Sequence, residues 1–120
     1  MKIAFCAIND NPDSLIDARF GRTGYIAIYD EETKNWQFIA NQQDLQAAQG
    51  AGLKTAQYLL DARADILIAK NVGPKAMRAL QGDGIEVYQV VEEISANQAL
   101  KKYLDGQLLK MEQANVQGHW

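Results

Sequence analysis

The stretch YIAIYDEETKNWQFIA, residues 25–40, decides what kind of sheet this chain builds. Residues 25–29 and 36–40 are rich in aromatic and β-branched side chains, and such runs are typical of strands. The polar residues 30–35 between them indicate a turn. Two strands joined by a short turn pair as a hairpin, so the sheet contains an antiparallel strand.

Three further strands are expected around this hairpin. Residues 2–8 precede it, and residues 64–69 and 85–90 follow it as short apolar runs of the kind that form buried strands. Between these runs, and after the last of them, apolar residues recur at helical spacing, which predicts helices there. The predicted order is therefore β-β-β-α-β-α-β-α, which implies a mixed α/β sheet with helices on both faces.

Local signals mark where the predicted helices begin and end. Pro74 stands at a favourable first helical position, and Ser95 with Gln98 forms a capping-box pattern. Right-handed crossovers then favour a five-stranded mixed sheet of order 3-2-1-4-5 with strand 2 antiparallel. This is the three-layer ribonuclease H-like arrangement.

The totals describe one ordinary globular domain without a nucleic-acid signature. The chain has 120 residues, 48% of them hydrophobic and 22% charged, and a net charge of -3. A duplex-binding protein usually carries a basic excess, so nucleic acid is not an expected partner. The single cysteine permits no internal disulfide, which fits a reducing cytoplasm.

The ends of the chain lead to two further expectations. The N-terminus lacks a signal-peptide pattern, and no apolar run approaches the ~20 residues of a membrane span. We therefore expect a cytoplasmic protein with no membrane association. Residues 1–106 are predicted to form the single α/β domain, and residues 107–120 a polar tail that frays.

A binding site is expected where the carboxyl ends of the parallel strands meet, because open α/β sheets bind ligands there. The loop after the first strand carries Arg19, Gly21 and Arg22, and two helix starts carry Gly52 and Gly73. Helix starts present unpaired N–H groups and a positive dipole end, and glycine permits close approach. Together with two guanidinium groups, these features predict a local anion site.

Structural explanations for the same residues stay open. The glycines have a second interpretation as helix caps or turn residues. Arg19 or Arg22 has a second interpretation as the partner of Asp17 or Asp30 in a surface ion pair, and such pairs contribute only ~0 to 1 kcal/mol.

Cys6 and His119 are the candidate metal ligands, because thiolate and imidazole suit iron and zinc. The alternatives are a small core residue for Cys6 and a solvated tail residue for His119. One cysteine and one histidine do not complete a closed four-ligand site, so open ligation, backbone contacts or a dimer would have to complete it. The expected oligomeric state is a monomer or a weak homodimer.

Taken together, these residues resemble the dinitrogenase iron-molybdenum cofactor biosynthesis family of nitrogenase accessory proteins. That family includes NifX-like carriers and the C-terminal part of NifB-like proteins, and the resemblance runs from Met1 to about Leu109. The resemblance rests on the stretches KIAF (2–5), RFGR (19–22), GAG (50–52), NVGPKA (71–76) and GIEVY (84–88).

The resemblance implies a ribonuclease H-like fold and non-catalytic binding of an iron-sulfur or iron-molybdenum cluster or its precursor. The implied partners are the metallocluster and its donor or acceptor proteins, and no enzymatic activity is implied. In nitrogenase carriers a histidine commonly precedes the Phe-Gly pair, whereas this chain has Arg19 there. A guanidinium stays protonated, so charge attraction rather than ligation is expected at this position.

Two other functions compete with this interpretation. A protein-interaction or regulatory domain would use the edge strand of the hairpin, which carries Trp36. A metal-dependent nuclease-like enzyme would use Asp10, Asp17 and Asp30, although two-metal chemistry needs converging carboxylates, and Lys70 after the fourth strand opposes cations.

Overall fold

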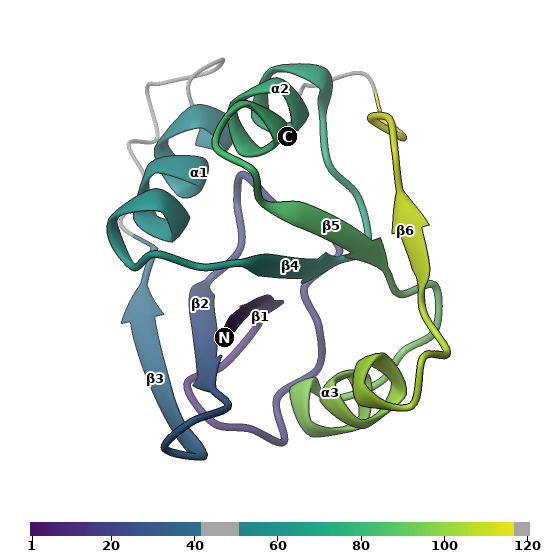
Figure 1. Ribbon diagram of the computed structural model, residues 1–120. Helices are drawn as coiled ribbons and strands as arrows, with labels where there is room; N and C mark the ends of the chain where they lie inside the picture. Colours follow the sequence, from purple (N-terminus) through teal and green to yellow (C-terminus); the bar gives the residue numbers. More distant parts are fainter. Residues whose placement is uncertain (42–50, 117–120) are drawn as a thin grey trace.

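A mixed sheet of six strands runs through the molecule, with helices on both faces (Figure 1). The structure is a computed structural model that describes residues 1–41 and 51–116. Its strands are β1 (Lys2–Ala7), β2 (Tyr25–Asp30), β3 (Asn35–Ala40), β4 (Ile66–Ala69), β5 (Glu86–Gln89) and β6 (Leu109–Met111). Its helices are α1 (Ala51–Asp61), α2 (Pro74–Gly82) and α3 (Ala96–Leu104).

The strand order β3-β2-β1-β4-β5-β6 confirms the predicted order of the first five strands. β2 is antiparallel to both β1 and β3, as the hairpin requires. β1, β4 and β5 are mutually parallel, with Ala4 opposite Leu67 and Leu67 opposite Val87. This is the ribonuclease H-like arrangement, and it brings the carboxyl ends of β1, β4 and β5 to one edge.

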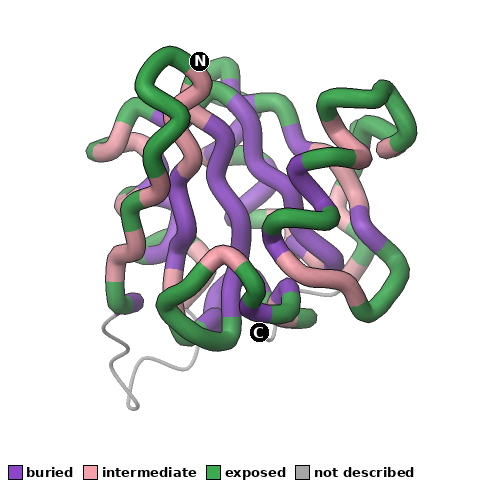
Figure 2. The backbone as a smooth tube through the Cα atoms, turned by 90° about the horizontal axis from the view of Figure 1, so that it is seen from below, coloured by how far each residue is buried: buried purple, intermediate pink, exposed green. Residues whose placement is uncertain are grey.

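The sheet separates two apolar layers. Helices α1 and α2 cover one face and α3 covers the other (Figure 1). Successive residues of β1 alternate between the layers: Ala4 and Cys6 pack beneath α1 and α2, whereas Ile3 and Phe5 pack toward α3. The central strands are therefore buried on both faces, and Figure 2 shows them enclosed by exposed connections.

Helix boundaries agree with the signals in the sequence. Gly73 is the N-cap of α2, with Pro74 following it, and Ser95 and Gln98 form both reciprocal bonds of a capping box. Gly84, just beyond α2, has φ +76°, a conformation that favours glycine. Within residues 1–41 and 51–116, none of the helices has the length and apolar character of a membrane span.

The sixth strand was not predicted. Leu109–Met111 pairs antiparallel with β5, with Met111 opposite Val87, so the expectation that the whole of residues 107–120 frays is wrong for this segment. The pattern was missed because β6 has three residues and buries only Met111. The domain boundary at residue 106 stays a prediction.

Candidate functional site

The predicted segments do meet at the carboxyl edge of the sheet. β1 and β4 end there at Ala7 and Ala69, and the antiparallel register brings the start of β2 at Tyr25 and the end of β3 at Ala40 to the same edge. The β1–β2 loop, the start of α1 and the β4–α2 loop are therefore neighbours. The hydrogen bonds described below join them directly.

The crevice between β1 and β4 is filled by the chain itself. Ala7 pairs with Tyr25 of β2 on one side and with Ile16 on the other, which is the side where β4 lies. The Asp17 N–H donates to the Cys6 carbonyl at 2.9 Å, and the Ile16 N–H donates to the Ile94 carbonyl at 3.0 Å. A ligand at this edge must therefore lie outside residues 15–17, on the loop that follows them.

We call residues 17–24 the arginine loop, and Asp17 closes it. One carboxylate oxygen of Asp17 accepts from the Arg19 N–H at 3.1 Å and the other from the Gly24 N–H at 3.3 Å. The Arg19 Nε lies 3.9 Å from Asp17 Oδ1, so the predicted surface ion pair forms at Arg19. The Arg19 side chain is still 50% exposed, and such a pair leaves its guanidinium open to other anions.

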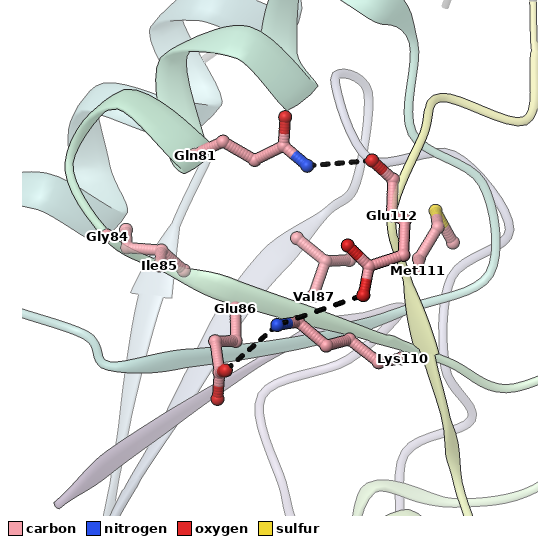
Figure 3. A pocket seen from close by; sticks show the side chains of 8 residues that line it. All are labelled: Gln81, Gly84, Ile85, Glu86, Val87, Lys110, Met111 and Glu112. Carbon is pink, nitrogen blue, oxygen red and sulfur yellow. Dashed lines mark hydrogen bonds and ion pairs between the residues drawn. The ribbon is translucent and has the colours of Figure 1, made fainter.

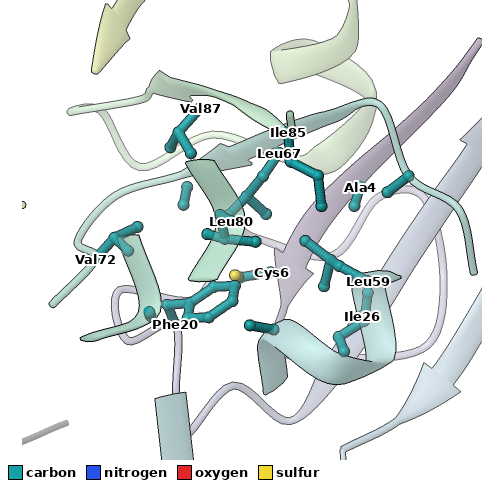
Figure 4. Close-up of a cluster of buried hydrophobic side chains, with 14 of the residues drawn as sticks. Ala4, Cys6, Phe20, Ile26, Leu59, Leu67, Val72, Leu80, Ile85 and Val87 are labelled. Atoms are coloured by element: carbon teal, nitrogen blue, oxygen red, sulfur yellow. The ribbon is translucent and has the colours of Figure 1, made fainter. Parts of the chain in front are cut away.

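Phe20 anchors the middle of the arginine loop. Its ring is 2% exposed and belongs to the core beneath α1 and α2 (Figure 4), and Gly21 beside it is also buried. Because Phe20 and Gly21 turn inward, Arg19 and Arg22 stand on either side of a buried pair. No carboxylate in residues 1–41 or 51–116 forms an ion pair with Arg22.

A buried polar network fastens the arginine loop to α1. The Thr55 hydroxyl lies 3.1 Å from the Gly21 carbonyl oxygen and 3.0 Å from that of Ala51. It also accepts from the Asn41 amide at 3.2 Å, and the same amide reaches the Thr23 carbonyl at 3.0 Å. Burial makes an unmet polar group costly, so this network fixes the loop relative to the helix.

Asn71 fastens the same loop to the β4–α2 connection. Its side-chain amide donates to the Ala18 carbonyl at 2.8 Å. The arginine loop is thus hydrogen-bonded at Ala18 to the β4–α2 loop and at Gly21 to α1. Neither Asn71, Asn41 nor Thr55 was predicted as a site residue, because hydrogen bonds between segments so far apart in the chain leave no local pattern.

The start of α2 keeps its positive end available. Its N-cap Gly73 has φ -78°, which any residue adopts, and supplies no side-chain cap. At α3, by contrast, Ser95 caps the helix, and the Ala96 and Asn97 N–H groups donate to the carbonyls of Ser14 and Pro12. Among residues 1–41 and 51–116, no side chain accepts a hydrogen bond from the first turn of α2, whereas the start of α3 is capped by Ser95.

Gly52 has a packing role that differs from the predicted one. A Cβ on Gly52 would lie 3.3 Å from the Cβ of Ala76, so glycine here permits the close contact of α1 with α2. In the GAG motif, Gly50 lies outside the described residues. His119, the predicted tail ligand, also lies outside them.

Cys6 is a core residue. Its sulfur lies among Phe20, Leu59 and Leu80 in the layer beneath α1 and α2 (Figure 4), and its side chain is 1% exposed. Burial, and secondarily the charge of Asp17, raises the pKa of the thiol well above its usual range. Because metal ligation needs the thiolate, this environment does not suit the predicted ligand role, and the alternative interpretation accounts for the position.

A cavity lies apart from this edge, and the described residues contain no cluster of metal ligands. A shallow cavity of about 200 Å³ opens between the end of α2 and β6, where Lys110 Nζ lies 3.1 Å from Glu86 Oε2 and 3.9 Å from Glu112 Oε1 (Figure 3). The Lys110 ammonium group in this cavity is therefore already paired with two carboxylates. Among residues 1–41 and 51–116, no three His, Cys, Asp or Glu side chains gather into a group that could hold a metal ion.

Comparison with known proteins identifies the family. The profile described as "Dinitrogenase iron-molybdenum cofactor" matches residues 1–106, and the chain belongs to this family. An uncharacterized protein of Methanocaldococcus jannaschii, MJ0580, is 30% identical over 93% of this chain and 92% of its own. The predicted family membership is therefore confirmed.

Two solved structures share both fold and sequence. The apo form of the orange protein from Desulfovibrio gigas superposes with a TM-score of 0.91 at 36% identity, covering 96% of each chain. A protein from Thermotoga provisionally named NifB, TM1290, superposes with a TM-score of 0.78 at 26% identity, covering 98% of each chain.

We expect the Thr55→Val variant to lose about 1 to 3 kcal/mol of unfolding free energy, because it removes the buried hydroxyl that hydrogen-bonds both the Asn41 amide and the Gly21 carbonyl. Urea unfolding followed by circular dichroism measures the change. Thr33→Val, in the exposed turn between β2 and β3, is the matched control and should change stability by less than about 0.5 kcal/mol. Equal losses in the two variants would contradict the network.

The Cys6 thiol should resist modification in the folded protein. At pH 8 an exposed cysteine begins to ionise, whereas the raised pKa keeps Cys6 as the neutral, buried thiol. Ellman's reagent should therefore react slowly with the native chain and at once, with one equivalent of thiol, in guanidinium chloride. Rapid stoichiometric reaction of the native chain would show that Cys6 is accessible.

Proposed function

We propose that this protein binds and carries an anionic iron-sulfur or iron-molybdenum-type cluster, or its precursor, without chemical turnover. The cargo would sit on the arginine loop at the carboxyl edge of the sheet, against the start of α2. Arg19 and Arg22 would supply the charge, and the backbone around Gly73 would approach the cargo closely. Gly21, which is buried, would instead hold the loop through its carbonyl. The observation that carries this proposal is the hydrogen-bonded junction of the arginine loop with α1 and the β4–α2 loop.

Electrostatics supports an anion at this position. Arg22 has no carboxylate partner in the described chain, and Arg19 has one distant partner. The dipole of α2 adds positive potential at the same edge. On a protein of net charge -3, such a concentration of positive groups is local rather than general.

The relatives support a small-molecule cargo. The family is described by the iron-molybdenum cofactor of dinitrogenase, and the Desulfovibrio gigas relative is an orange protein solved in an apo form. A protein with an apo form also has a ligand-bound form, and an orange colour requires a group that absorbs visible light. For this chain we infer a coloured metallocluster as cargo. The arginine loop would hold it by charge, and the chain would exchange it in the cytoplasm with donor and acceptor proteins.

Cys6 and His119 have different places in this proposal. Cys6 is left out, because its buried thiol belongs to the core. His119 stays a proposed metal ligand that lies beyond the described residues. Gly52 contributes through the packing of α1 against α2 rather than through contact with the cargo.

Anaerobic reconstitution with ferrous iron and sulfide tests the proposal. The wild-type chain should retain visible absorbance after desalting, and the Arg19→Ala, Arg22→Ala double variant should retain about a tenth or less, because two ion pairs of about 1 kcal/mol each are lost. The control removes two arginines elsewhere: Arg63→Ala, Arg78→Ala should retain the wild-type amount. Equal retention by both double variants would contradict the proposed site.

A further inference from the structure

The segment after β6, residues 112–116, runs along α2 and is hydrogen-bonded near both ends of that helix. Near the end of the helix, the Gln81 side-chain amide donates to the Glu112 carbonyl at 2.9 Å. Near its start, Asn115 contacts the β4–α2 loop. The segment lies beyond residues 1–106, the part of the chain that the family profile matches.

Asn115 makes four hydrogen bonds to this loop. Its Oδ1 accepts from the Val72 N–H at 2.8 Å, and its backbone N–H donates to the Val72 carbonyl at 3.2 Å. Its Nδ2 donates to the Lys70 carbonyl at 2.9 Å and to Asn71 Oδ1 at 3.1 Å. Both polar atoms of the amide are used, so the position requires the asparagine side chain rather than any small polar residue.

Asn71 continues the contact to the arginine loop. Its Oδ1 accepts from Asn115, and its Nδ2 donates to the Ala18 carbonyl at 2.8 Å. The donors therefore point one way, from Asn115 to Asn71 to Ala18, the residue directly before Arg19. Accepting from Asn115 fixes the orientation of the Asn71 amide, which aims its N–H at the arginine loop.

We infer that Asn115 is a positioning residue of the proposed cargo site, acting through Asn71 on the arginine loop. The inference rests on the proposed function for its cargo and adds a residue from outside the matched family region. Asn115 itself touches neither arginine. Its effect is to hold the β4–α2 loop and the Ala18–Arg19 backbone in one arrangement, as outer-shell partners do around metal sites.

The first measurement is the release of a cluster reconstituted from ferrous iron and sulfide to an excess of chelator, followed by visible absorbance. Asn115→Ala and Asn71→Ala should each accelerate release about tenfold. Asn115→Asp should accelerate it as well, because the carboxylate keeps the acceptor for Val72 but loses both donors. The control is Gln81→Ala, which loosens the same segment at its other end and should leave the release rate unchanged.

Combinations separate positioning from general loosening. Asn71→Ala with Asn115→Ala should release the cluster no faster than either single variant, since the two amides act in series. In the Arg19→Ala, Arg22→Ala background, adding Asn115→Ala should accelerate release much less than it does in the wild-type chain. Additive acceleration, or equal acceleration by Gln81→Ala, would overturn the inference.

A second measurement does not depend on the cluster. Amide hydrogen exchange at residues 18–22 should quicken in Asn115→Ala and stay unchanged in Gln81→Ala. If the wild-type chain takes up no cluster, the proposed function fails, and the exchange result still decides whether Asn115 positions the loop. Unchanged exchange at residues 18–22 in Asn115→Ala would refute the inference by itself.

Discussion

The hydroxyl of Thr55 is the contact on which the arrangement of the carboxyl edge depends. It is fully buried and joins the Gly21 carbonyl, the Asn41 amide and the first turn of α1. An unmet polar group in this position would cost about 1 to 3 kcal/mol, so the loop, the end of β3 and the helix hold one another in register. A loop that was free to move would bind an anion less tightly, because ordering the loop and its two arginines around the ligand would cost conformational entropy.

That constraint explains how an acidic chain presents a positive site. Phe20, which lies between Arg19 and Arg22 in the chain, is buried in the core, and the hydrogen bond at Gly21 fixes the loop against α1. The Asp17 carboxylate accepts from two backbone N–H groups and lies 3.9 Å from Arg19, so it shapes the loop and offsets one of its two positive charges. The Arg19 side chain stays half exposed, and Arg22 forms no ion pair with a carboxylate of residues 1–41 or 51–116.

Much of the fold is predictable because it depends on local sequence patterns. The hairpin of residues 25–40, the Pro74 start and the Ser95–Gln98 capping box each depend on neighbours in sequence, and each was confirmed. The meeting of the loop with two helix starts followed from topology alone. β6 was missed because three residues, one of them buried, carry no periodicity.

The details of the site were less predictable for a physical reason. Thr55 and Gly21 are 34 positions apart, and Asn71 and Ala18 are 53 apart, so no spacing rule pairs them. The orientation of Cys6 was undecidable because a strand buried on both faces shows no polar alternation. Gly52 looked like a ligand-facing glycine, whereas the close approach of Ala76 is visible only once α1 and α2 are packed.

The most direct test of this account is a comparison of amide chemical shifts before and after the chain is reconstituted anaerobically with ferrous iron and sulfide. The account predicts that broadening and shifts concentrate at residues 17–24, 51–55 and 70–76, which come together only at the carboxyl edge. Changes concentrated instead along β3, or around the cavity between α2 and β6, would place the cargo elsewhere and contradict it.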